Sequence, residues 1–311
     1  MREARVPGLA ACIVKDGAIT WEQGYGRANI ANSRLATPDT IFMLASISKT
    51  VMAVAVMQAV EDGLLDLDAD VNEALPFPVR NPRHPDAPIT IRMLLTHTSS
   101  IRDDWPTIIP FYSHGDSPIT LGDYLDRYLM PGGDLRPAPK LFGLAAGSAV
   151  RLLQPRRSPR GLSGRIGLRH RLRPVVQRPD LHAARHEPHQ LAPKGARSPP
   201  DRDAVSLPGP EFVAYGQYGY PDYPDGELRT SARQLSHHLV AFMQFGEFAG
   251  TRILQEATVR EMRRVQDANV AHGQGLIWYR FALRDMALMA TTAATAASRR
   301  RCISDRRTMS V

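Results

Sequence analysis

A 70-residue stretch in the middle of this chain is poorly suited to forming a hydrophobic core. Residues 141–210 contain 13 Lys and Arg against four Asp and Glu, ten of the 25 prolines, and one aromatic residue, Phe142. So little apolar surface does not offset the conformational entropy that is lost on folding. A structureless insertion of this length is also unusual inside a compact domain. We therefore expect the fold to be built from the two flanking regions.

The rest of the chain has the composition of an ordinary globular protein. Its 311 residues are 43% hydrophobic, enough for one large or two modest domains. Outside residues 141–210 and the tail 290–311, 21 basic residues face 26 acidic ones, so the net positive charge comes from those two segments. The two cysteines, Cys12 and Cys302, exclude a disulfide framework and a CxxC metal pair and leave the cellular compartment open.

The sequence predicts no membrane span and no export signal in the chain as written. It has no run of 18 or more apolar residues, and its first residues lack the charged-then-apolar layout of a signal peptide. The chain as written is expected in the cytoplasm, whereas a true start further upstream would allow export, so the localisation stays open. The oligomeric state is also left open.

Turn and cap signals predict both strands and helices. Residues 9–14 and 19–22 flank Asp16-Gly17, a strong hairpin signal. Residues 46–62 contain neither Pro nor Gly and end at Gly63, as a helix with a glycine C-cap does. Strands at both ends with helices between them indicate an α+β fold. We expect further helices over 90–96, 121–128, 231–245 and 256–265, and a late strand over 275–281.

Ser46 and Lys49 form a Ser-x-x-Lys pair at the start of the longest predicted helix. Three residues span about one helical turn, so both side chains lie on one face, and the lysine amine can reach the serine hydroxyl. A neighbouring base makes a serine hydroxyl nucleophilic, and a desolvated lysine at a helix N-terminus can supply it. The motif is short and therefore has a second interpretation. Ser46 would then only cap the helix, and the Lys49 side chain would lie in solvent.

The surrounding segments extend this motif well beyond four residues. In order and spacing they resemble the serine β-lactamase family, in the class C-like branch that includes D-alanyl-D-alanine carboxypeptidases, esterases and D-aminopeptidases. The resemblance covers roughly residues 6–135 and 212–289. It is carried by Val6-Pro7-Gly8-Leu9, residues 40–49, 63–71 and 90–100, and the later block Tyr218 to Ala232, which contains Pro224-Asp225-Gly226-Glu227-Leu228-Arg229-Thr230-Ser231-Ala232.

The resemblance implies a penicillin-recognising serine hydrolase that works through an acyl-enzyme. Ser46 would attack an amide, ester or β-lactam carbonyl of a small-molecule or peptide substrate, Lys49 would be the base, and no cofactor is implied. It also implies an α+β fold, which we expect to be incomplete in this chain. In that fold, N- and C-terminal strands form an antiparallel sheet flanked by helices, and a helical domain lies between them. The expected divisions are a hairpin region 1–45, a helical region 46–140, the segment 141–210, a return to the α/β domain over 211–289, and the tail 290–311.

Three histidines have ordinary structural interpretations. His97 and Ser99 lie at the predicted end of helix 90–96, where local capping and packing is favoured over catalysis. His237 and His238 lie within a predicted helix, with no third ligand at metal spacing, so we expect no zinc site.

Two elements that the resemblance implies are missing. A Tyr-x-Asn is expected near residues 150–155, and a Lys/His-x-Gly strand just after Met289, and neither is present. Both gaps fall in the two segments of unusual composition, 141–210 and 290–311. We therefore interpret these segments as translated in a shifted reading frame. Codons compatible with residues 147–155 encode Tyr-Ser-Asn in the neighbouring frame. We therefore expect this exact chain to have little activity, and residues 277–281 to form an unpaired strand edge.

The alternative function is non-enzymatic nucleic-acid binding through the basic segment 141–210. That function predicts lysines and aromatic residues among the arginines, whereas the segment holds one lysine, Lys194, and one aromatic residue. Its arginine and proline enrichment is typical of GC-rich DNA read out of frame. The composition thus disfavours a nucleic-acid partner.

Overall fold

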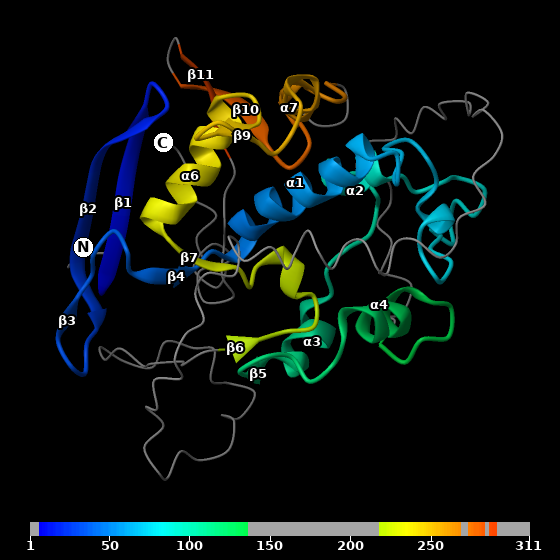
Figure 1. The fold of residues 1–311 in the computed structure, drawn as a ribbon. Coiled ribbons are helices and arrows are strands. Elements are labelled where there is room, and N and C mark those ends of the chain that lie inside the picture. The colour runs from blue at the N-terminus through cyan, green and yellow to red at the C-terminus, as the bar shows by residue number, and fades with distance from the viewer. Residues whose placement is uncertain (1–5, 136–217, 269–272, 284–285, 291–311) are drawn as a thin grey trace.

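The computed structural model describes residues 6–135, 218–268, 273–283 and 286–290. The predicted segment 141–210, and the tail beyond Ala290, lie outside the described residues. The described parts on either side of residues 136–217 pack against each other (Figure 1). The fold mixes helices with antiparallel strands, as predicted.

The predicted hairpin forms and is longer than its sequence signal. Strand β1 (Gly8–Lys15) pairs antiparallel with β2 (Ala18–Asn29), and β2 pairs with β3 (Arg34–Leu35). Asp16 and Gly17 both have positive φ, 51° and 77°, as a two-residue type I′ turn requires. Helix α6 (Ala232–Met243) packs against β1 and β2 (Figure 1).

The predicted helices are present, with boundaries set by their caps. The first, α1 (Ser48–Glu61), begins two residues later than predicted, because residues 45–47 form a tighter 3₁₀ turn. Thr90, Thr120 and Ser231 cap three helices by accepting hydrogen bonds from main-chain N–H groups. The remaining helices are α2 (Ile91–Leu95), α3 (Trp105–Ile108), α4 (Leu121–Leu129) and α7 (Glu256–Arg263). The 3₁₀ turns are η1 (Ala45–Ile47), η2 (Val71–Glu73), η3 (Ile109–Phe111) and η4 (Tyr223–Asp225).

Short strands join segments that are far apart in the chain. Strand β4 (Ile41–Met43) pairs with β7 (Arg229–Ser231), and β5 (Ser113–His114) pairs with β6 (Tyr218–Gly219). A third small ladder joins β8 (Glu247–Phe248) to β9 (Thr251–Arg252). The β4–β7 pairing brings the family-like block near residue 229 beside the chain that leads into α1.

The late strand predicted over 275–281 is only partly right. Strand β10 (Tyr279–Leu283) starts later, and residues 276–278 are buried in the core instead. Ile277 has a φ of +66°, which breaks an extended strand, and its N–H donates to the Leu95 carbonyl at 2.7 Å. The predicted unpaired edge is wrong for one side of the strand, because β11 (Met286–Ala290) pairs antiparallel with β10; β10 and β11 form a sheet of two strands, so the other side of β10 has no strand partner among the described residues. Within the described residues this ladder does not join β1, β2 or β3.

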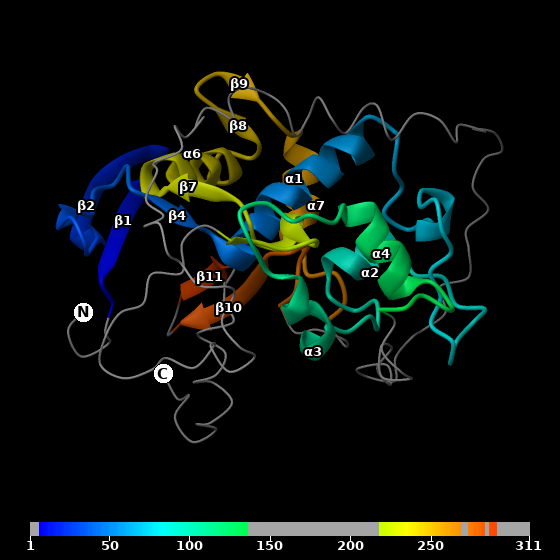
Figure 2. The same cartoon turned by 90° about the horizontal axis from the view of Figure 1, so that it is seen from below.

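Two clusters of buried side chains form the core, and Figure 2 shows how the contributing helices α1, α4, α6 and α7 are arranged. The larger lies between α1, α6 and α7 and mixes residues from both halves of the chain, with Ala53 and Met57 against Phe242, Leu254 and Val259. The smaller is built around α4 and the segments that lead to it, and it contains Val71, Val79, Ile89, Ile108, Tyr124, Tyr128 and Leu129. The start of α1 is held against residues 225–231 by hydrogen bonds and by the β4–β7 ladder.

Candidate active site

Ser46 lies in η1, between strand β4 and helix α1. Its neighbour Ala45 has a φ of +48°, a left-handed conformation that is uncommon for a residue with a side chain. The turn is held in place by Leu44, whose N–H donates to the Leu228 carbonyl at 2.8 Å and whose carbonyl accepts from Ile47 at 3.3 Å. Tertiary contacts thus hold Ser46 in a strained turn directly before the helix.

Lys49 lies on the first turn of α1, and its side chain points back to Ser46. The ammonium donates to Ser46 Oγ at 3.2 Å, to the Asp225 carbonyl oxygen at 2.9 Å and to Asp225 Oδ2 at 3.1 Å. An ammonium has three N–H donors, so these three contacts use all of them. The structure therefore brings Ser46 and Lys49 together, as their spacing predicts, and adds Asp225 as a third member.

Asp225 belongs to η4, which reaches the site from a position 176 residues further along the chain. Its segment is joined to α1 by the Leu228 N–H, which donates to Ser48 Oγ at 3.2 Å. The residue that follows, Gly226, is closely packed: a Cβ there would lie 2.2 Å from the Tyr220 hydroxyl. The sequence marked this block as family-like, but it carried no signal that an Asp225 carboxylate would reach Lys49.

The charge of Lys49 affects the pKa values of two further groups, Asp222 and His97. Burial first, and then the nearby carboxylates Asp225 and Asp103, raise the pKa of Asp222 to about 6, while Lys49 partly opposes them. Asp222 Oδ1 is buried and has no hydrogen-bond partner among the described residues. Burial lowers the pKa of His97, and Lys49 lowers it further. His97, interpreted from sequence as a capping and packing residue, thus lies within electrostatic reach of the site.

Tyrosines from both halves of the chain stack beside this segment. The ring centroid of Tyr112 lies 4.8 Å from that of Tyr220 and 5.9 Å from that of Tyr218. Burial raises the pKa of Tyr220, which keeps its phenol protonated. The stack supports the loop that carries Asp222 and Asp225.

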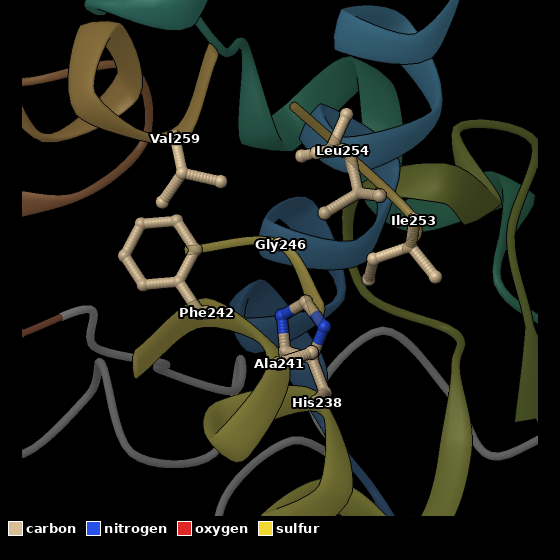
Figure 3. Close-up of a pocket in the computed structure, with 8 residues that line it drawn as sticks. His238, Ala241, Phe242, Gly246, Ile253, Leu254 and Val259 are labelled. Carbon is tan, nitrogen blue, oxygen red and sulfur yellow. The ribbon is translucent and has the colours of Figure 1, made fainter. Parts of the chain in front are cut away.

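His238 belongs to a separate, apolar region of α6. Its Nε2 lies 3.1 Å from Thr50 Oγ1, and burial lowers its pKa to about 4, so the ring is neutral at pH 7. The ring lines a small pocket (Figure 3). The other lining residues are Val54, Ala241, Phe242, Gly246, Ile253, Leu254 and Val259.

The His, Cys, Asp and Glu side chains of the described residues form no group of three or more that could hold a metal ion. No helix in this part of the chain combines the length and apolarity needed to cross a membrane.

Comparisons of sequence show where the chain resembles known proteins. Residues 1–130 match the family model for beta-lactamase. The chain is 36% identical over 101 residues to the human serine beta-lactamase-like protein LACTB, mitochondrial, covering 32% of this chain and 18% of that protein. It is 38% identical over 102 residues to esterase EstB of Burkholderia gladioli, covering 32% of this chain and 26% of the esterase. The match thus spans only about a fifth to a quarter of these relatives.

Solved structures share the fold over most of the chain. A penicillin-binding protein homologue from Pyrococcus abyssi superposes with a TM-score of 0.58 at 20% identity, covering 93% of this chain and 64% of that one. D-amino acid amidase from Ochrobactrum anthropi gives a TM-score of 0.55 at 18% identity, covering 94% and 82%. These identities establish the fold alone, whereas the sequence matches show similarity over the N-terminal part of the chain. The chain is thus similar to the beta-lactamase family over residues 1–130, and it shares the fold of the penicillin-binding protein homologue.

Proposed function

We propose that this chain is a serine hydrolase in which Ser46 is the nucleophile and Lys49 the base. The observation that carries the proposal is the 3.2 Å contact between Lys49 Nζ and Ser46 Oγ at the start of α1. Oγ is thus within direct proton-transfer distance of an amine. The contact lies within residues 1–130, the part of the chain that matches the family model.

The reaction is acyl transfer in two steps. Lys49 in its neutral form takes the proton of Ser46 as Oγ bonds to the substrate carbonyl carbon, and the resulting ammonium gives that proton to the departing amine or alcohol. Water then attacks the acyl-enzyme, loses a proton to Lys49 and releases the acid, while Ser46 recovers its hydrogen. The Ser46 main-chain N–H and the N-terminal end of α1 favour the oxyanion formed in both steps.

The substrates that we propose are amides, esters or β-lactams with an accessible carbonyl. The esterase match supports an ester, and the fold shared with D-amino acid amidase supports an amide. No contact among the described residues favours one of these three carbonyl classes over the others.

Trapping of the acyl-enzyme tests this proposal. The purified chain is incubated with a fluorophosphonate and with p-nitrophenyl acetate, and the adduct is located by peptide mass spectrometry. We expect the adduct on Ser46, with loss in Ser46→Ala. Lys49→Arg keeps the positive charge but cannot serve as a base, so labelling should fall at least about 100-fold. Lys15→Arg, at the exposed end of the hairpin, is the matched control and should label normally. Equal labelling of Ser46→Ala would refute the proposal.

We also propose that turnover by this exact chain is slow, because its sequence has no Tyr-x-Asn and no late Lys/His-x-Gly. Steady-state hydrolysis of nitrocefin and p-nitrophenyl acetate should be far below the rate of Ser46 labelling. Turnover at rates ordinary for enzymes, around 10 per second, would contradict this. Sequencing of the coding DNA across codons 136–212 and 285–311 tests the cause, since a shifted frame predicts single-base insertions or deletions there.

A further inference from the structure

We propose that Asp225 is a positioning residue that holds Lys49 as an ammonium against Ser46, so that the folded site rests in its proton-loaded state. Its link to catalysis rests on the proposed function, whereas the contact between Asp225 and Lys49 does not. The proposal predicts that removal of one carboxylate makes Lys49 a more available base.

The geometry around Lys49 carries this inference. Asp225 accepts twice from the ammonium, through its main-chain carbonyl at 2.9 Å and through Oδ2 at 3.1 Å. The third donor points at Ser46 Oγ, which is therefore the acceptor in this arrangement. General-base catalysis needs the reverse, with a lone pair on Nζ facing the Ser46 proton. With Lys49 held as an ammonium, as we propose, the site must lose a proton before it can act.

Several charged groups lie around the ion pair of Lys49 and Asp225. Its side chain is 22% exposed and that of Asp225 is 43% exposed, so solvent weakens the ion pair without abolishing it. Asp222, from the same loop as Asp225, and Asp103, from the segment after α2, add negative potential, and His97 is held neutral. Asp225 is the carboxylate that contacts the ammonium directly, so its removal is the change that we expect to affect Lys49 most.

The composition of the chain makes a direct test practical. It contains only four lysines, at positions 15, 49, 140 and 194. Trace labelling with acetic anhydride modifies only the neutral amine, and mass spectrometry quantifies each lysine at a series of pH values. Lys15, exposed at the end of β1, is an internal reference. The readout is the pH at which Lys49 becomes half as reactive as it is at its plateau.

Asp225→Asn removes the charge and keeps the shape and the main-chain carbonyl. We expect the labelling midpoint of Lys49 to move to lower pH by about half a unit, which is a roughly threefold gain in reactivity at pH 8, with Lys15 unchanged. Asp225→Glu restores a carboxylate and should return the midpoint toward wild type. Asp134→Asn, which removes an exposed carboxylate paired with Arg127, is the control and should leave Lys49 unchanged.

The readout separates charge from simple exposure. A loosened site would raise the plateau of Lys49 labelling without moving its midpoint, and that result would overturn the proposal. A midpoint that stays fixed or rises in Asp225→Asn would do the same. In a second arm, Ser46 labelling by the fluorophosphonate should extend to lower pH in Asp225→Asn. Failure of every variant to label Ser46 would refute the proposed function, while the midpoint of Lys49 would still decide the role of Asp225.

Discussion

Asp222 is the site residue whose charge the fold disfavours most. Its Oδ1 is buried and has no hydrogen-bond partner among the described residues, and Asp225 and Asp103 add like charge nearby. Burial first, and then these carboxylates, raise its pKa from 3.8 to about 6. A group whose pKa is higher in the folded state stabilises the protein only while protonated, and that contribution is lost as the pH rises through the folded value.

Asp222→Asn should therefore stabilise the chain at neutral pH. The neutral amide removes the cost of a buried charge, so the free energy of unfolding at pH 7 should rise by up to about 3 kcal/mol. The gain should shrink between pH 6 and pH 4, where the wild-type carboxyl becomes protonated. Urea unfolding at pH 7 and pH 4 measures both effects. A variant less stable than wild type at pH 7 would show that Asp222 has a stabilising partner.

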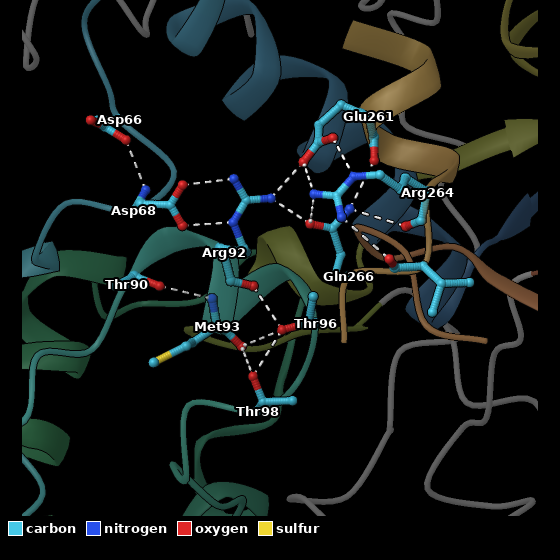
Figure 4. Close-up of polar contacts among 11 residues, drawn as sticks. Asp66, Asp68, Thr90, Arg92, Met93, Thr96, Thr98, Glu261, Arg264 and Gln266 are labelled. Atoms are coloured by element: carbon cyan, nitrogen blue, oxygen red, sulfur yellow. Dashed lines mark hydrogen bonds and ion pairs between the residues drawn. The ribbon is translucent and has the colours of Figure 1, made fainter. Parts of the chain in front are cut away.

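At the scale of elements, one ion-pair network joins α2 to α7 (Figure 4). Arg92 on α2 donates to both oxygens of Asp68, at 2.7 and 2.8 Å, and to Glu261 of α7 at 2.6 Å. Arg264 donates to the same Glu261 at 2.7 Å. Arg264 first, and then Arg92, lower the pKa of Glu261 to about 2 against the opposing effect of burial. The network thus connects residues 169 positions apart.

Arg92→Lys should loosen this connection, because an ammonium cannot bind Asp68 through two parallel N–H groups and also reach Glu261. We expect a loss of about 1–3 kcal/mol in the free energy of unfolding at pH 7. Glu261 has a lowered pKa, so its contribution is present above about pH 4.5 and is lost as the pH falls toward 2; the difference between the proteins should narrow there. Arg260→Lys, in the exposed pair with Glu256, is the control and should cost under about 0.5 kcal/mol. Equal losses in both variants would contradict the network.

At the scale of the whole molecule, residues before 136 and after 217 form one packed unit. The larger core cluster contains Met57 of α1 together with Leu254 and Val259, and the β4–β7 ladder joins the same halves through the main chain. The candidate site lies on this junction, since Ser46 and Lys49 come from one half and Asp225 from the other.

A cut between the halves should therefore leave them associated. A protease recognition sequence is inserted after residue 175, the purified chain is cleaved, and the N-terminal piece is captured through a tag. We expect the C-terminal piece to remain bound under native buffer and to be released by urea, because burial of shared apolar surface holds the halves together. Met57→Asp places a charge in the shared core and should release the piece without urea. Separation of the unmutated halves would contradict the packing seen here.

Local signals predicted the elements that depend on neighbouring residues. The Asp16-Gly17 turn, the Thr90 and Ser231 caps and the glycine stop at Gly63 each satisfy backbone groups within a few residues, so the sequence shows them directly. The segment 275–281 was predicted less well, because its apolar residues suit a strand and a buried turn equally. The hydrogen bond from Ile277 to Leu95, which no local pattern encodes, decided between them.

The sequence by itself determined the spacing of Ser46 and Lys49, since three residues at a helix start place two side chains on one face whatever surrounds them. It also determined the α+β class, through turns and apolar periodicity. The contact of Asp225 with Lys49, the burial of Asp222 Oδ1 and the hydrogen bond from Leu44 to Leu228 all depend on tertiary packing. These contacts join residues more than 170 positions apart, and their geometry depends on how the two halves pack rather than on any local preference of the chain.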